Sequence, residues 1–87
     1  MGSQMNENIA LDADFWRAFS RAMGRAVEPG HYQVAQIAEW DSLRHVELIF
    51  ELEESLRVDI PPDAIAGLYS DTDTLLSFLR SRGAASR

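Results

Sequence analysis

Three residues with chemically capable side chains lie close together in the chain: Asp41, Ser42 and His45. A carboxylate, a hydroxyl and an imidazole are the parts of a catalytic triad, in which the imidazole takes the proton of the hydroxyl. Here all three fall on about one turn of a predicted helix, and 87 residues are too few to build a substrate cleft and an oxyanion site around them. We therefore expect no catalytic residue and no enzyme activity, and we interpret Ser42 as an attachment point.

A structural interpretation of the Asp41-Ser42 pair competes with attachment. Asp and Ser are preferred at helix starts because their side-chain oxygens accept free backbone N–H groups. A capping box begun by Ser42 would need Glu or Gln at position 45, which is His45. A serine at a helix N-terminus is also well placed to carry a phosphodiester, whose negative charge the free N–H groups and the helix dipole would favour. Both interpretations require a helix that begins at this pair.

The helix predicted over residues 42–56 carries two apolar stripes when its residues are placed at about 100° each. The inner stripe, which is enough for one buried face, consists of Leu48, Ile49, Leu52 and Leu56. The outer stripe consists of Leu43, Val46 and Phe50, with Glu53 on one side and Glu47 and Glu54 on the other. Apolar residues fringed by carboxylates are typical of a docking surface, although a larger core contact would also explain them. His45 lies beside the inner stripe, and we expect it to be packed or to lie at the rim of the core, and not to be a ligand.

The rest of the chain predicts an all-α bundle of three or four helices, with a long loop after the first helix. The first helix is expected over about 13–27, capped by Asp12, with Leu11 packing on Trp16 as a hydrophobic staple. Glu28-Pro29-Gly30 should end it. Apolar residues then pin residues 31–40 over the core as an ordered loop.

Two further helical segments are expected after residue 56. Pro61-Pro62 stops the second helix, and a short helical turn is expected at about 63–68. Ser70 is predicted to be the N-cap of the last helix, with Asp73 completing a capping box, and this helix should end near 80–82. We interpret residues 1–5 as an expression scar with a disordered start, 6–82 as a single domain and 83–87 as a frayed tail.

Charge and composition narrow the classes of partner. The net charge is −6, and eight acids stand between Glu39 and Asp63 against only Arg44 and Arg57. This balance argues against nucleic acid or a membrane surface as a partner and favours a basic protein surface. There is no cysteine, and His31 and His45 lack the spacing of a metal pair, so we expect no metal. The start is too polar for a signal peptide, and a cytoplasmic location is expected.

Several short motifs together resemble the acyl carrier protein family. They are Asp41-Ser42-Leu43, Val46-Glu47-Leu48, Leu52-Glu53-Glu54 and Ile60-Pro61, and the resemblance covers about residues 36–79. It implies that a separate phosphopantetheinyl transferase attaches 4′-phosphopantetheine to Ser42, beside Asp41 and Leu43. The thiol of that arm would hold an acyl or aminoacyl group as a thioester. It also implies that loading and processing enzymes contact Leu43, Val46, Glu47, Phe50 and Glu54. We expect the carrier to be a monomer.

Two departures from that family point away from housekeeping fatty-acid synthesis. Fatty-acid and polyketide carriers usually have a glycine shortly before the Asp-Ser pair, where this chain has Ala38-Glu39-Trp40. Arg44 stands where fatty-acid carriers tend to be acidic. Both favour a free-standing carrier of a specialised pathway, whether polyketide, non-ribosomal peptide or specialised fatty-acyl metabolism. The alternative is an unmodified helical adaptor that binds one partner protein through the helix over 42–56.

Overall fold

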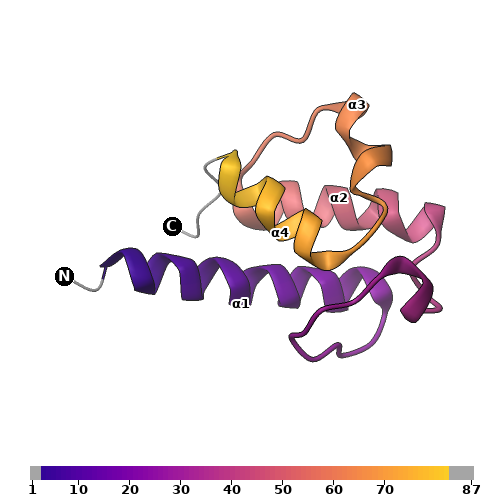
Figure 1. Ribbon diagram of the computed structural model, residues 1–87, viewed down its shortest axis with the longest axis horizontal. Helices are drawn as coiled ribbons and strands as arrows, with labels where there is room; N and C mark the ends of the chain where they lie inside the picture. The colour runs from indigo at the N-terminus through magenta and orange to yellow at the C-terminus, as the bar shows by residue number, and fades with distance from the viewer. Residues whose placement is uncertain (1–2, 83–87) are drawn as a thin grey trace.

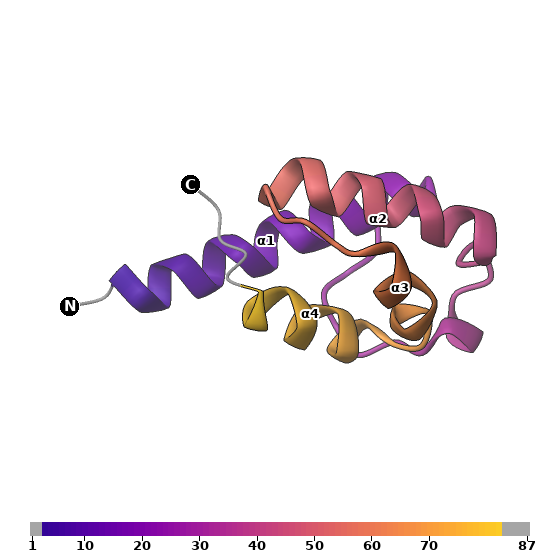
Figure 2. The ribbon, with the colours of Figure 1, turned by 90° about the horizontal axis from the view of Figure 1, so that it is seen from above.

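Two antiparallel helices, α1 (Ser3–Met23) and α2 (Ser42–Leu56), lie side by side in the computed structural model, which describes residues 3–82 (Figure 1). They are followed by α3 (Pro62–Ile65) and α4 (Thr72–Ser81), with short 3-10 helices η1 (Val34–Gln36) in the long loop and η2 (Ala66–Leu68) after α3. From above, α4 lies on the same side of α1 as α3, and the first turns of α1 extend beyond the other helices (Figure 2). The predicted all-α bundle with a long loop between the first two helices is confirmed.

The bounds of α1 differ from those predicted. The helix begins at Ser3 instead of near Ala13, so Asp12 lies inside it and does not cap it. The carboxylate of Asp12 instead accepts a hydrogen bond from Arg80 of α4, at 2.8 Å, and Leu11 lies in the core as an ordinary helical residue, not as part of a staple. The helix ends before Glu28-Pro29-Gly30, because Gly24 takes a left-handed conformation with φ 78° and its N–H donates back to the carbonyl of Ser20.

Apolar side chains from α1, α2 and α4 fill one core. From α1 come the aromatic rings of Phe15, Trp16 and Phe19, which lie within 6 Å of one another between centroids. All four residues of the inner stripe of α2 are buried, as predicted, and α4 adds three leucines: Leu75, Leu76 and Leu79. The helix α2 therefore packs through the face that its apolar spacing predicted.

Hydrogen bonds join the long loop of residues 24–41 to the start of α4. The N–H of Val34 donates to the carbonyl of Ser70 at 2.8 Å, and the N–H of Thr72 donates to the carbonyl of Tyr32 at 2.9 Å. The N–H of Tyr32 in turn donates to the hydroxyl of Thr72 at 3.0 Å, and the Thr72 side chain is fully buried. These bonds satisfy backbone groups that a loop over the core would otherwise leave unpaired.

The cap of α4 is Asp71, not Ser70 as predicted. The Asp71 carboxylate accepts the N–H of Thr74 at 2.7 Å, and this bond holds the pKa of Asp71 below its usual value. Ser70 lies one residue too early to reach that N–H, and its hydroxyl donates to Asp71 instead. The short turn after Pro61 is confirmed as α3 and η2. Within residues 3–82 no helix is long and apolar enough to cross a membrane.

The interpretation of residues 83–87 as a frayed tail lies outside the described residues. The same holds for residues 1–2 of the interpreted expression scar.

Candidate attachment and docking site

The helix that carries Ser42 begins where the sequence predicted. Asp41 is its N-cap, with an extended backbone, and one carboxylate oxygen accepts the N–H of Arg44 at 2.8 Å. The carbonyl of Asp41 accepts the N–H of His45, also at 2.8 Å. Ser42 is the first residue of α2 and is exposed. The cap is therefore Asp41 alone, which leaves the hydroxyl of Ser42 without a capping role.

Arg44 joins the start of α2 to the end of α1. Its guanidinium Nη1 donates to the carbonyl oxygens of Ala22 and Met23, at 3.2 and 2.5 Å. These are among the last carbonyls of α1, which have no partner within the helix and favour a positive charge. A Cβ at Gly24 would lie 3.1 Å from Nη1, so the glycine also gives the guanidinium room. Arg44 was unexpected against the acyl carrier pattern, and here it has a structural use.

His45 is buried and bound at both ring nitrogens. The indole Nε1–H of Trp40 donates to Nδ1 of His45 at 3.0 Å, and Nε2 of His45 lies 2.8 Å from the carbonyl oxygen of Ile65. Because the indole nitrogen is only a donor, Nδ1 must be the acceptor, so Nε2 carries the proton and donates to Ile65. Burial lowers the pKa of His45, and the bond to Ile65 opposes this in part. Neither nitrogen is left to take a proton from Ser42.

The outer stripe of α2 is exposed, as the docking interpretation requires. Leu43, Val46 and Phe50 have 68%, 40% and 62% of their surface accessible, and they are the exposed large apolar residues among residues 11–82. They lie on the same side of α2 as Ser42, within about 100° of it around the helix axis. The chain thus presents an apolar strip beside the serine.

The acidic residues of α2 divide into two groups. Glu51 accepts a hydrogen bond from Arg21 of α1 at 3.0 Å, and Glu53 accepts the N–H of Ile60 at 3.0 Å. Glu47 and Glu54 are exposed beside the outer stripe, and neither side chain makes a hydrogen bond or a salt bridge with residues 11–82. The sequence alone could not separate these groups, because the difference depends on α1 and on the turn after α2. Glu47 and Glu54 remain available to a partner.

Glu39, in the loop before Asp41, is used within the protein. One oxygen of its carboxylate accepts a hydrogen bond from Arg25 at 2.9 Å, which lowers the pKa of Glu39. The pair joins the first residues of the loop to its last residues. The carboxylate of Glu39 therefore helps to hold the loop in place.

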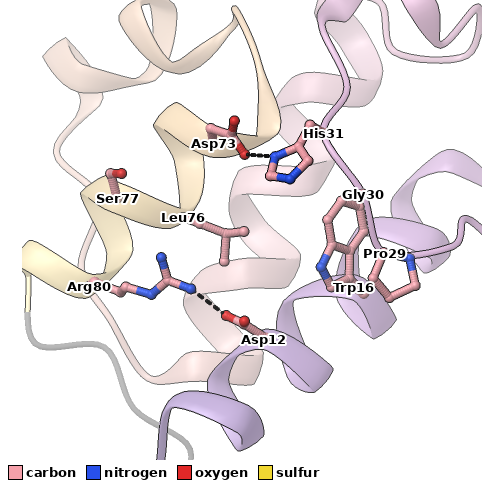
Figure 3. A pocket seen from close by; sticks show the side chains of 9 residues that line it. All are labelled: Asp12, Trp16, Pro29, Gly30, His31, Asp73, Leu76, Ser77 and Arg80. Carbon is pink, nitrogen blue, oxygen red and sulfur yellow. Dashed lines mark hydrogen bonds and ion pairs between the residues drawn. The ribbon is translucent and has the colours of Figure 1, made fainter.

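A separate shallow pocket lies between α1, α4 and the loop (Figure 3). A hydrogen bond between His31 and Asp73 and a salt bridge between Arg80 and Asp12 border it, each at 2.8 Å, and Trp16 forms part of its wall. None of its lining residues belongs to α2. In the described part of the chain no group of three or more histidines and carboxylates is placed to hold a metal ion.

Comparisons with known proteins give no assignment. No family model matches the chain, and no curated protein or solved structure matches it.

Proposed function

We propose that this chain is a cytoplasmic carrier whose Ser42 receives a 4′-phosphopantetheine arm. It would present acyl or aminoacyl groups on that arm to the enzymes of a specialised biosynthetic pathway. The observation that carries the proposal is the exposure of Ser42 at the first position of α2, beside an exposed apolar strip and two free carboxylates. The resemblance of Asp41-Ser42-Leu43 and the motifs after it to acyl carrier proteins supports the same conclusion.

The start of α2 suits a phosphodiester. Asp41 takes the N–H of Arg44 with its side chain and that of His45 with its carbonyl. The N–H groups of Ser42 and Leu43 have no carbonyl partner within the helix, and such free N–H groups at a helix start favour a bound phosphate. The helix dipole adds a favourable interaction with the negative charge.

The attachment chemistry asks little of this chain. The hydroxyl oxygen of Ser42 forms a bond to the phosphorus next to the pantetheine of coenzyme A, the pyrophosphate P–O bond breaks, and adenosine 3′,5′-bisphosphate leaves. The transferase must supply the base that takes the serine proton, because His45 is occupied in the core. Once attached, the arm supplies a thiol that holds an acyl group as a thioester. Ser42 and α2 hold the arm in place and offer a surface to each enzyme in turn.

The test is an intact-mass measurement after incubation with coenzyme A and a broad-specificity phosphopantetheinyl transferase. We expect one added arm on the wild type and none on Ser42→Ala. Ser77→Ala, which removes an exposed serine from α4, is the matched control and should be modified like the wild type. If wild-type protein shown to be folded by circular dichroism gains no mass, the carrier proposal is wrong.

The second candidate is an unmodified adaptor that binds one partner through the outer stripe. The exposure of Leu43, Val46 and Phe50 favours it, because an apolar strip can bind a partner with or without an arm on Ser42. The intact mass of the protein isolated from its native host separates the two. The adaptor predicts the mass of the unmodified chain, and the carrier predicts an added arm.

A further inference from the structure

The space between the start of α2 and α3 is closed by a cluster of three rings, Trp40, His45 and Tyr69, here called the ring cluster. The His45 ring lies 4.9 Å from that of Tyr69 and 6.0 Å from that of Trp40, measured between centroids. Trp40 and His45 are almost fully buried, and the Trp40 ring also meets Phe19 of α1 at 5.2 Å. This is the part of the core nearest in sequence to Ser42.

Hydrogen bonds hold the ring cluster to both sides of that space. His45 on α2 donates to the carbonyl of Ile65 in α3, and it accepts from the indole of Trp40. The hydroxyl of Tyr69 donates to the carbonyl of Trp40 at 3.2 Å. The start of α2, α3 and the segment just before α2 are therefore bound to one another by partly or fully buried hydrogen bonds.

An aliphatic chain that entered between α2 and α3 would have to break the bond between His45 and Ile65. It would leave a donor and an acceptor unpaired among apolar groups that cannot replace them. It would also have to displace close-packed rings, since protein interiors do not contain space for several methylene groups without rearrangement. Outside the bundle, a long aliphatic chain would remain exposed to water, which is unfavourable in proportion to its apolar surface.

We propose that the ring cluster excludes cargo from the bundle, so that this carrier holds its cargo in solvent and serves short or polar acyl or aminoacyl groups. The inference rests on the proposed function, because it concerns what hangs from the arm on Ser42. It assigns the ring cluster a second role besides packing: it selects against cargo that needs shelter from water.

The experiment loads the wild-type chain from acetyl-coenzyme A and, separately, from octanoyl-coenzyme A with the same transferase, and verifies each product by intact mass. Hydroxylamine then cleaves the thioester to a hydroxamic acid and the free thiol, and each rate is divided by that of the matching free acyl-pantetheine. We expect the acetyl and octanoyl ratios to agree within about twofold, because a group held in solvent gains no protection from the fold. The indole N–H signal of Trp40 in a ¹H–¹⁵N spectrum should be the same in both products.

An octanoyl ratio about tenfold or more below the acetyl ratio would overturn the inference, since only a sheltered thioester is protected to that degree. A shift of the Trp40 indole signal with the longer chain would overturn it as well. Neither result touches the carrier proposal, which fails earlier and separately, if no mass is gained in the loading step.

Discussion

His45 shows how one buried side chain can make the stability of a bundle depend on pH. Its ring has a donor on one side and an acceptor on the other, which fixes the neutral form with the proton on Nε2. The groups that contact the ring are the indole of Trp40, the ring of Tyr69 and the carbonyl of Ile65, and the salt bridges found within residues 3–82 do not include His45. A protonated ring would therefore lose the bond from Trp40 without gaining a counter-ion.

We expect the free energy of unfolding to fall as the pH is lowered from about 6.5, the usual pKa of histidine, down through the lower pKa of folded His45. The sign follows because the unfolded chain binds the proton more readily than the folded chain. The slope due to this one group cannot exceed about 1.4 kcal/mol per pH unit. Urea denaturation at several pH values between about 5 and 7.5 measures it, above the range where most carboxylates titrate.

His45→Gln is the control for the pH dependence, because its amide can accept from Trp40 and donate to Ile65 but does not titrate. This variant should be less stable at neutral pH, and its free energy of unfolding should change less with pH across this range. His31, which is exposed and pairs with Asp73, is retained in this variant and so contributes equally to both proteins. Equal slopes in the two proteins would show that His45 does not carry the effect.

At the scale of the element, α2 presents two different faces. The inner stripe is buried in the core, whereas the outer stripe is exposed beside Ser42. The free carboxylates Glu47 and Glu54 lie beside the outer stripe, and Glu51 and Glu53 are taken up within the protein. Mutations on the two faces should therefore affect different measurements.

Leu52→Ala should reduce the free energy of unfolding by about 2 to 5 kcal/mol, because it opens a cavity at a fully buried position. Phe50→Ala should leave the thermal midpoint nearly unchanged and slow the transferase reaction, as expected for an aromatic anchor at an interface. Calorimetry and initial rates of mass gain measure the two effects. If Phe50→Ala reduced stability as much as Leu52→Ala, the outer stripe would belong to the core.

Replacement of Glu47 and Glu54 by Gln should slow the transferase reaction and reduce its dependence on salt, because these exposed charges would steer a basic partner. The matched control is the pair Glu51→Gln and Glu53→Gln, which should act mainly on stability, since both carboxylates bind within the protein. Initial rates at several salt concentrations measure the effect. If the rates of the wild type showed no dependence on ionic strength, these acidic side chains would be only a solvated face of the helix.

The sequence predicted α2 far better than its neighbours, for physical reasons. The Asp41-Ser42 start, the two stripes and the following prolines agree on a single helix, and its bounds match. Residues 3–12 lack a clear apolar period, so the sequence did not predict that α1 extends over them. Pro29-Gly30 is a stronger sequence signal for a helix end than Gly24, although the helix ends just before Gly24. Ser70 and Asp71 are both good caps, and spacing alone does not choose between them. The contacts of Arg44 and of the ring cluster depend on tertiary packing, which no local pattern encodes.

At the scale of the whole molecule, the loop of residues 24–41 is fixed by the start of α4. The carbonyl and N–H of Tyr32 both bind Thr72, and Val34 binds Ser70. The hydroxyl of Tyr69, which lies shortly before α4, donates to the carbonyl of Trp40, just before the start of α2. The segment that precedes Ser42 is therefore held from two sides, and the stability of the site depends on residues about 30 positions further along the chain.

We expect Thr72→Val to reduce the free energy of unfolding by about 1 to 3 kcal/mol, because it keeps the shape of the side chain and leaves the partly buried N–H of Tyr32 without an acceptor. Thr72→Ser, which keeps the hydroxyl, should be closer to the wild type. Chemical denaturation measures both. If the valine variant were as stable as the wild type, the hydroxyl of Thr72 would not be holding the loop.

The hydrogen bonds between the loop and the start of α4 also affect the order in which the chain folds. These hydrogen bonds join residues 36 or 40 positions apart, so forming them means closing a segment that contains the whole of α2 and α3. The hydrogen bonds offset the entropy lost on closure only when both ends are in place. Pairing of this kind is therefore slow relative to helix formation. These hydrogen bonds should thus form after α1 and α2 have associated. Their loss should mainly speed unfolding and leave the rate of folding almost unchanged.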